Sequence, residues 1–249
     1  MKIWFYEEFP SDKNLEKARK ISFPTTIFLA ARSISEFKKL RKKLQAKNKR
    51  VLAEYWPILE KGEGYWISPF ADSKAIKRII SELEREKQRI KVVWDMELPV
   101  HHKWLLIKNL PMFLYNKKII HNFLKRTKHE IFVTENIILG TSWAGIILGR
   151  CDKGCKTKKT LMFYTSMLGS LRNEFFARLE KEKKRLGKRL TVGLGTIAPG
   201  IRGDEAVMST RQLDMDLRDM KALGIEKVWI FRLGGLNPGY LKVIGKYLT

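Results

Sequence analysis

The sequence predicts an α/β protein, a single (β/α)8 barrel domain that spans residues 1–249. Short apolar runs rich in β-branched and aromatic residues alternate with charged runs in which apolar residues recur every three to four positions. Eight such pairs in 249 residues match the count and length of this barrel. The apolar runs are continuous, as expected of parallel strands covered on both faces. A doubly wound open sheet is the alternative, because alternation does not show closure.

The apolar runs give the expected strands, and the charged runs between them give the helices. The strands are expected at residues 3–6, 25–30, 51–55, 90–94, 130–134, 160–164, 190–194 and 227–231. Helices are expected at residues 14–20, 35–46, 73–89, 117–127, 171–186, 210–223 and 238–247. Gly187 is a typical stop for the helix before it. Residues 137–148 are apolar without a clear period, so a buried helix and an extra strand both fit.

Charge narrows the range of partners. The chain has 50 Lys and Arg against 26 Asp and Glu, a formal net charge of +24, which attracts nucleic acid or an anionic surface. The basic runs, however, fall on expected outer helix faces such as residues 38–43 and 181–185, which is typical of solvated surface. Rare Gln beside abundant Lys, Arg and Glu is also typical of heat-adapted proteins.

Several classes of protein are disfavoured by the sequence. No apolar run reaches the roughly 18 residues that a membrane span needs. Acidic residues precede any long apolar run near Met1, so we expect no signal peptide and a cytoplasmic location. Cys151 and Cys155 have a C-x3-C spacing, which fits a local disulfide or two thiols better than a zinc site. No cofactor is expected.

The candidate site is the set of residues at the strand exits, because barrel active sites lie at the carboxyl ends of the strands. Carboxylates stand at four of the eight expected exits, although the chain has few of them. Asp95 and Glu97 are two residues apart, so an extended strand places both on one side. When two carboxyl groups lie close together, repulsion between their charges raises the pKa of one of them. That group can act as a general acid beside a charged carboxylate, which is the arrangement that glycoside hydrolysis needs.

These considerations predict a glycosidase-like hydrolase acting on a carbohydrate or another small polar substrate. The pair Asp95 and Glu97 would supply the proton donor and the charged carboxylate beside it, with Glu54 or Glu135 as base or nucleophile. Aromatic side chains at the exits would position the sugar, and further polar ones would bind it: Tyr164, Trp56, Tyr55, Glu7, Arg32 and Arg232. The alternative is that the acidic residues form structural salt bridges with Arg32, Arg232 or lysines.

Two segments resemble a known family. Val92-Val93-Trp94-Asp95-Met96-Glu97 resembles the fourth-strand motif of family-18 glycoside hydrolases (chitinase-like barrels), and Leu161-Met162-Phe163-Tyr164 resembles their sixth-strand Met-x-Tyr pattern. The chain is similar to the same degree to a lysozyme-like barrel with Asp-x-Glu on a strand. The resemblance implies Glu97 as the general acid, Asp95 as its partner and Tyr164 as a positioning residue. The chain departs from the family at Thr165, where an acidic residue is usual, and it lacks the second-strand Ser-x-Gly-Gly signature.

Other functions remain open at this stage. Asp95, Glu97, Glu54 and Glu135, joined by His101 and His102, have the ligand chemistry to hold Mg²⁺ or Mn²⁺ in an enzyme acting on a phosphorylated substrate. Residues 234–238 offer a turn that can bind phosphate or simply cap the last helix. A non-catalytic polyanion-binding barrel is the third alternative.

Two further segments have alternative interpretations. Residues 195–204 form a loop long enough to cover the barrel mouth as a lid. Trp104, Leu105, Leu106, Met112, Phe113 and Leu114 lie among Lys103, Lys108, Lys117 and Lys118, a composition that suits a membrane surface. We expect these apolar side chains to lie in the core or to anchor a loop.

Overall fold

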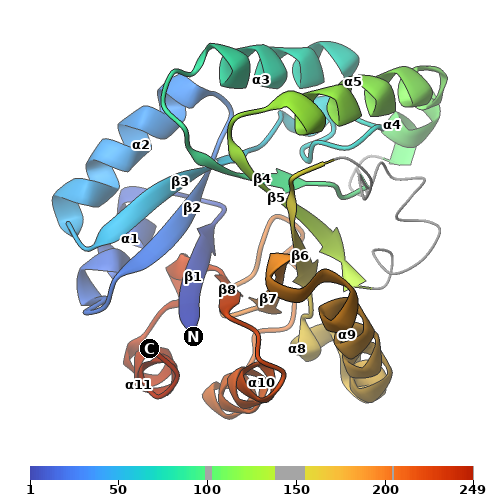
Figure 1. Cartoon of the computed structure of the whole chain (residues 1–249). Coiled ribbons are helices and arrows are strands. Elements are labelled where there is room, and N and C mark those ends of the chain that lie inside the picture. The colour runs from blue at the N-terminus through green and yellow to red at the C-terminus, as the bar shows by residue number, and fades with distance from the viewer. Residues whose placement is uncertain (99–102, 138–154, 204, 249) are drawn as a thin grey trace.

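The computed structural model describes residues 1–98, 103–137, 155–203 and 205–248, which form a closed barrel of eight parallel strands (Figure 1). Each strand pairs with the one before it, and β8 pairs with β1. Closure confirms the predicted barrel and excludes the open sheet. The strands are β1 (Lys2–Glu7), β2 (Thr25–Ala31), β3 (Val51–Pro57), β4 (Lys91–Asp95), β5 (Glu130–Asn136), β6 (Lys158–Met162), β7 (Leu190–Gly195) and β8 (Lys227–Phe231).

The helices pack around the outside of the barrel. They are α1 (Asp12–Leu15), α2 (Ile34–Lys47), α3 (Ser73–Arg85), α4 (Lys103–Lys108), α5 (Phe113–Arg126), α8 (Thr165–Leu168), α9 (Arg172–Leu186), α10 (Thr210–Ala222) and α11 (Pro238–Gly245). Short 3-10 turns are η1 (Glu16–Lys20), η2 (Lys61–Glu63), η4 (Leu110–Met112), η5 (Gly169–Leu171), η6 (Gly187–Arg189) and η7 (Leu233–Gly235). None of the described helices is long and apolar enough to cross a membrane.

The predicted elements are present, with small displacements. β3 and β5 each run two residues beyond their predicted ends, and β6 lies two residues earlier than expected. The expected helix at 14–20 is a single α-turn followed by a 3-10 turn. Gly187 ends α9 with φ of 56°, a conformation that glycine adopts without strain. Residues 138–154, which include Cys151, lie outside the described residues, and Cys155 is disulfide-bonded.

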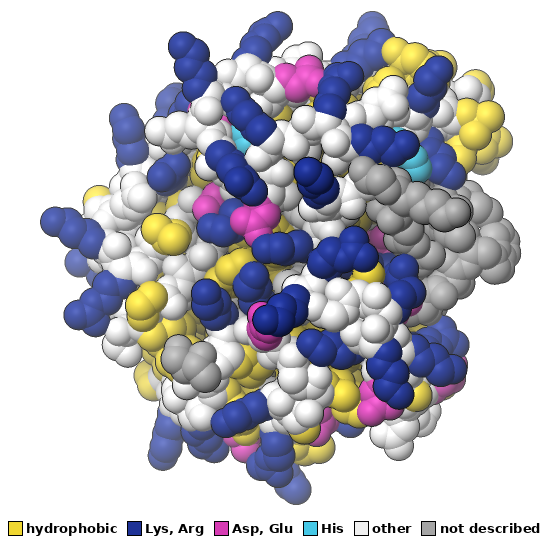
Figure 2. All heavy atoms as spheres, viewed as in Figure 1, with side chains coloured by type: hydrophobic (Ala, Val, Ile, Leu, Met, Phe, Trp, Pro, Cys, Tyr) yellow, Lys and Arg dark blue, Asp and Glu magenta, His cyan; other side chains and the backbone are white. Residues whose placement is uncertain are grey.

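Helix starts follow from side chains that accept hydrogen bonds from otherwise unpaired amides. Ser33 accepts from the amide of Glu36 at the start of α2, and Ser209 accepts from that of Gln212 at the start of α10. Asp72 caps α3 by accepting from two amides. Such caps stabilise a helix by about 0.5–2 kcal/mol. Lys and Arg side chains cover much of the face shown in Figure 2, as expected for the outer helix layer.

Side chains alternate between the barrel interior and the helix layer, and the alternation fills the interior with aromatic rings. Trp4, Phe28, Phe132 and Trp229 form one buried cluster inside the barrel. The Trp4 and Trp229 ring centroids lie 5.0 Å apart at 87°, and those of Phe28 and Trp229 lie 4.3 Å apart. The intervening strand residues pack outward against the helices. The interior is therefore a solid core, so a site has to lie at one end of the barrel and not within it.

Trp229→Ala tests this packing. Its side chain is fully buried in the interior cluster, so we expect a loss of about 3–5 kcal/mol in the free energy of unfolding, measured with urea. Met215→Ala, an exposed change on α10, is the control and should stay within about 0.5 kcal/mol. Equal effects of the two changes would contradict a close-packed interior.

Candidate active site

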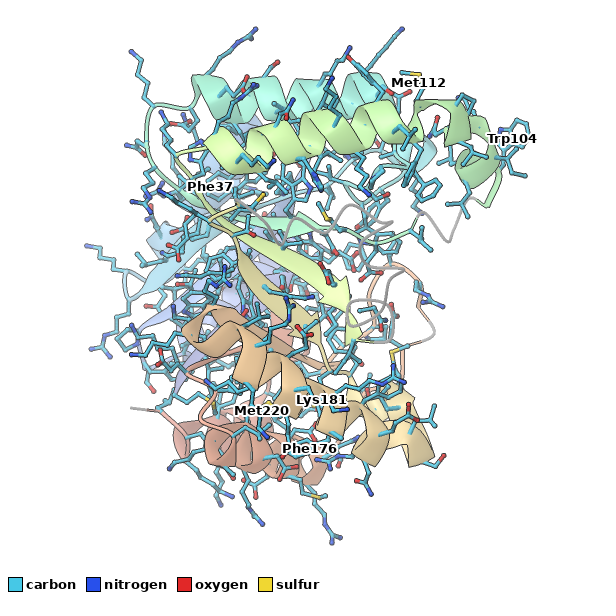
Figure 3. All side chains as sticks on the ribbon, turned by 45° about the vertical axis from the view of Figure 1, so that its right-hand side comes forward. Phe37, Trp104, Met112, Phe176, Lys181 and Met220 are labelled. Carbon is cyan, nitrogen blue, oxygen red and sulfur yellow. The ribbon has the colours of Figure 1, made fainter. Side chains whose placement is uncertain are left out.

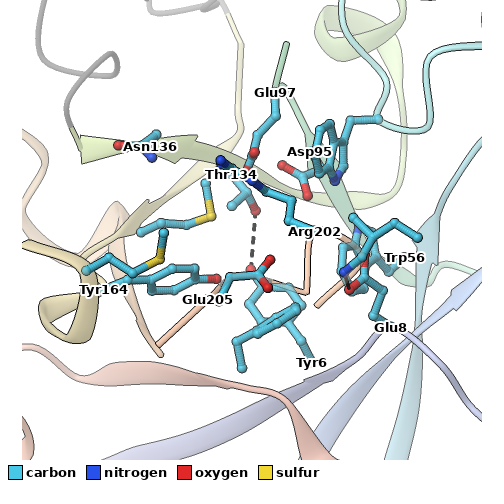
Figure 4. Close-up of a pocket in the computed structure, with 15 residues that line it drawn as sticks. Tyr6, Glu8, Trp56, Asp95, Glu97, Thr134, Asn136, Tyr164, Arg202 and Glu205 are labelled. Carbon is cyan, nitrogen blue, oxygen red and sulfur yellow. Dashed lines mark hydrogen bonds between the residues drawn. The ribbon is translucent and has the colours of Figure 1, made fainter. Parts of the chain in front are cut away.

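A pocket opens at the carboxyl end of the barrel, directly above the aromatic interior (Figure 4). Its walls come from the ends of β1, β3, β4, β5, β6 and β8 and from the loop after β7. The lining residues are Tyr6, Glu8, Trp56, Trp66, Asp95, Glu97, Thr134, Asn136, Met162, Tyr164, Met167, Ile201, Arg202, Glu205 and Phe231. The set contains four carboxylates and one arginine, so the pocket is acidic in a strongly basic protein.

Asp95 and Glu97 both line this pocket from the end of β4. Asp95 is buried, and its Oδ1 has no hydrogen-bond partner among the described residues. Burial, and then the charges of Glu97 and Glu8, raise the pKa of Asp95 well above its usual value. Burial, and then the charge of Glu8, raise the pKa of Glu97 to about 7, and Arg202 opposes that rise. The pair therefore retains protons at higher pH than ordinary carboxyl groups do.

Glu8 connects the end of β1 to two distant loops. Its carboxylate accepts a hydrogen bond from the Tyr65 hydroxyl at 2.8 Å and one from the Ile201 amide at 2.9 Å. Burial raises the pKa of Glu8 to about 7, although both hydrogen bonds favour its charged form. Glu205 accepts from the Gly200 amide at 3.1 Å. The loop after β7 thus lies over the mouth, held by two carboxylates, in the place the sequence suggested for a lid.

Gly200 is required where this loop meets Glu8. A Cβ built on Gly200 would lie 2.8 Å from Glu8 Oε2 and 2.8 Å from the Phe231 ring. Real Cβ atoms essentially never approach other atoms that closely, so a side chain at this position would force the Glu8 carboxylate, the Phe231 ring or the loop to shift. The close approach of backbone to carboxylate explains why glycine stands here.

Hydroxyl and indole groups complete the pocket. The Tyr6 hydroxyl and Thr134 Oγ1 are 3.2 Å apart. Burial raises the pKa of Tyr6 and of Tyr164, so both phenols stay neutral. The buried Trp56 Nε1 has no hydrogen-bond partner among the described residues. A buried donor without a partner costs free energy, and a bound polar ligand would supply the missing acceptor.

Three of the residues expected at strand exits lie elsewhere, because the strands run on beyond the predicted ends. Glu54 lies two residues before Trp56 on the same face of β3, where it pairs with Lys91 Nζ at 2.9 Å. Tyr55 and Glu135 point the other way, into the helix layer. Tyr55 stacks on Phe37 with ring centroids 5.2 Å apart.

Glu135 forms an ion pair with Lys159 Nζ at 2.8 Å, in the layer between β5 and α9. Its neighbours on β5, Thr134 and Asn136, are the ones that line the pocket. The expectation that Glu54, Tyr55 and Glu135 reach the mouth is therefore wrong.

Glu7, Arg232 and Arg32 form structural contacts instead of lining the pocket. Glu7 Oε1 lies 3.2 Å from Arg232 Nη1, and Glu7 Oε2 accepts from the Gly234 amide at 2.6 Å. The Gly234 amide thus binds the chain's own carboxylate, and Asn237 caps α11, so the turn has the structural role that was the alternative to phosphate binding. Arg32 pairs with Glu60 at 2.9 Å, and both side chains are largely exposed. For these residues the salt-bridge alternative of the sequence analysis describes the structure.

The described residues show no grouping of side chains suited to a metal ion. No cluster of three or more His, Cys, Asp or Glu with metal-site geometry is present among those residues. Of the four carboxylates suggested for a divalent ion, only Asp95 and Glu97 line the pocket. His101 and His102 lie outside the described residues.

The sequence predicted Glu7 as a site residue, whereas Glu8 is the residue of this pair that lines the pocket. The alternation along β1 contained the signal, since Trp4 and Tyr6 face the interior and Glu8 continues that series. Thr134 and Asn136 could have been found by the same rule. No local pattern marks Arg202 or Glu205, which reach the pocket from a loop nearly two hundred residues away from Glu8 in the chain.

The raised pKa of Glu8 predicts how stability depends on pH. The pKa rises from an ordinary value of 4.5 to about 7 in the folded chain, so the folded state binds more protons than the unfolded state between these values. The free energy of unfolding should therefore fall as pH rises through this window. Glu8→Gln should reduce that fall in chemical denaturation, whereas the exposed Glu84→Gln should not. An identical pH dependence in Glu8→Gln and the unchanged protein would contradict burial of this carboxylate.

Solved structures similar to this chain include glycoside hydrolases. The glycoside hydrolase domain of PgaB from Bordetella bronchiseptica is 11% identical, with a TM-score of 0.57 over 96% of this chain and 92% of that one. The spore cortex-lytic enzyme SleL of Bacillus cereus is 12% identical, with a TM-score of 0.59 over 100% of this chain and 74% of that one. A class V chitinase from Nicotiana tobaccum is 10% identical, with a TM-score of 0.55 over 99% of each chain.

No family model matches the chain, and no curated protein matches it in sequence. At these identities the similarity shows the fold, and function has to be argued from the site. The resemblance to glycoside-hydrolase barrels noted in the sequence is therefore confirmed at the level of the barrel.

Proposed function

We propose that this barrel hydrolyses a glycosidic bond, with Glu97 as the proton donor. The observation that carries the proposal is the pairing of Asp95 and Glu97 in an acidic pocket that raises the pKa of Glu97 to about 7. A general acid must hold its proton at working pH and still release it in the transition state. A carboxyl group of ordinary pKa is already ionised at neutral pH.

Asp95 positions Glu97 and adjusts its proton affinity. It is buried beside Glu97, and one of its oxygens has no partner among the described residues. Two neighbouring carboxylates do not both ionise freely, so a proton added to either stabilises the pair. The same unpaired oxygen is available to a substrate hydroxyl or amide.

Glu8 is the best-placed second carboxylate, since Glu54 and Glu135 do not line the pocket. Figure 4 shows Glu97 and Glu8 on different sides of the pocket. The Tyr65 hydroxyl and the Ile201 amide hold the Glu8 carboxylate in place and favour its charged form. A fixed carboxylate opposite the acid is what a base, or a group that stabilises the developing positive charge on the sugar, requires.

Aromatic residues make the pocket suitable for a sugar. Trp56, Trp66 and Tyr164 line it, and aromatic faces pack well against the C–H side of a sugar ring. The Trp56 indole N–H, unpartnered among the described residues, is a ready donor to a sugar oxygen. A class V chitinase of similar fold was solved in complex with the oligosaccharide NAG4, so NAG4 is the first substrate to test.

The second candidate function is carbohydrate binding without hydrolysis. A tamarind chitinase-like lectin has the same fold, with a TM-score of 0.52 and 11% identity. The present chain also has Thr165 where the family has an acidic residue. Binding of an oligosaccharide that remains intact would favour this alternative.

Glu97→Gln tests the proposed acid. Glutamine keeps the shape of the side chain but cannot donate the proton, so kcat on the oligosaccharide should fall by about 10²–10⁴-fold. Glu54→Gln, a carboxylate that lies outside the pocket, is the control and should change kcat little. Circular dichroism would verify that both variants fold.

Unchanged turnover in Glu97→Gln would contradict the proposal. Loss of the unchanged protein's activity in a chelator, restored by Mg²⁺ or Mn²⁺, would contradict it in favour of the metal alternative.

Arg202→Gln tests the electrostatics of the acid. Arg202 lowers the pKa of Glu97, so its removal should raise that pKa. The rate limb that falls as Glu97 loses its proton should then move to higher pH. The measurement is the pH profile of kcat/KM for both proteins, and a shift to lower pH would contradict the assignment.

A further inference from the structure

The segment from α4 to the start of α5 exposes large apolar side chains in an unusual concentration. We define the α4–α5 ridge as Trp104, Ile107, Leu110, Met112, Leu114 and Tyr115. These are six of the eleven exposed large hydrophobic residues in the described chain, and Leu114 is 75% exposed. Figure 3 shows Trp104 and Met112 projecting away from the body of the protein. The expectation that Trp104, Met112 and Leu114 lie in the core or anchor a loop is therefore wrong.

The outward direction of the ridge is fixed by polar side chains on the opposite face of the same segment. Asn116 Nδ2 donates to the carbonyls of Pro69 and Ala71 at 2.9 and 3.0 Å, and its Oδ1 accepts from Ser73 Oγ at 2.7 Å. Asn109 Nδ2 donates to the Phe70 carbonyl at 2.7 Å.

Both asparagines are buried. Turning the ridge inward would break four hydrogen bonds between buried polar groups, which is costly. The inward face of the segment therefore combines the two asparagines with Leu105 and Phe113, whereas most of its large apolar side chains face outward, unlike the usual arrangement of a surface helix.

The charge around the ridge has one sign. Residues 98–129 contain no Asp or Glu, but they contain six lysines and one arginine. Lys108, within the ridge, and Lys118, just after it, are both exposed. Lys77 of α3 lies over the Tyr115 ring, 4.9 Å from its centroid. A partner that covers this surface must offer apolar contact together with negative charge.

We propose that the α4–α5 ridge docks the protein on an anionic lipid surface. A helix with Trp and Leu on one side and lysines beside them suits the boundary between headgroups and acyl chains, and Trp is the residue enriched at that depth. A second copy of this chain would bring a net charge of +24 against another of +24, which opposes self-association.

The ridge also lies on the mouth side of the barrel. α4 follows the end of β4, the strand whose exit places Asp95 and Glu97 in the pocket. Figure 1 shows α4 on the right-hand side of the view, the side at which β5 ends. Docking through the ridge would therefore bring the mouth toward the lipid surface. The proposal stands on exposure and charge alone and does not require the mouth to be catalytic.

Co-sedimentation with vesicles tests the proposal. We expect the unchanged protein to bind phosphatidylglycerol vesicles more strongly than phosphatidylcholine vesicles, with binding weakened by salt. Removing two apolar side chains in Trp104→Ser/Leu114→Ser should lower the partition coefficient by at least about tenfold. Leu171→Ser/Met215→Ser changes two exposed apolar residues elsewhere and should keep it. Lys108→Glu/Lys118→Glu should weaken binding to phosphatidylglycerol only.

Trp104 gives a second readout in the unchanged protein. The emission difference between the unchanged protein and Trp104→Phe should shift to shorter wavelength on phosphatidylglycerol vesicles. This measurement remains decisive if the double serine variant does not fold.

Three results would overturn the proposal. The first is no binding of the unchanged protein to phosphatidylglycerol vesicles. The second is equal binding by the ridge variant and the control variant, which would assign adsorption to net charge alone. The third is a dimer that the ridge variant dissociates, which would make the ridge a contact between copies.

Discussion

The two-residue alternation of side chains along closed parallel strands is the constraint on which the site depends. In a barrel, one set of strand residues faces the interior and the other faces the helices. Trp4 belongs to the interior set, so Tyr6 and Glu8 follow it upward to the mouth, whereas Glu7 turns into the wall. The same rule places Thr134 in the pocket and Glu135 against Lys159. Chemistry at the mouth is therefore determined by the register of each strand rather than by the presence of an acid near its end.

The aromatic interior explains why the few carboxylates at the mouth behave unusually. It closes the barrel below the pocket, and the loop carrying Ile201 and Arg202 covers it from above. Carboxyl groups between these two layers lose hydration and approach one another, and both effects favour their protonated forms. The charge of Arg202 lowers the pKa of Glu97 and so opposes part of this effect. The overall charge of +24 belongs mostly to the outside of the molecule, so it does not describe the environment of the pocket.

The architecture and part of the site could be predicted from the sequence. Continuous apolar runs marked all eight strands, and the spacing of Asp95 and Glu97 placed both on one side of a strand. The end of β3 was placed too early, because proline usually interrupts a strand, whereas Pro57 here forms its last residue. The contact between Ile201 and Glu8 joins distant parts of the chain, and no local signal encodes it. The exposure of the ridge was not predicted, because Asn109 and Asn116 share the contact with the loop before α3 with Phe113 and leave the other large apolar side chains of the segment outside.

The central claim is that burial and crowding at the mouth keep a proton on Glu97 near neutral pH. Carbon-13 NMR of protein labelled at the glutamate carboxyl carbons tests it most directly, with the Glu97 resonance assigned by its absence in Glu97→Gln. The account predicts that this resonance titrates at about 7 and at higher pH in Arg202→Gln. Titration near the ordinary value of 4.5, unchanged by removal of Arg202, would contradict it.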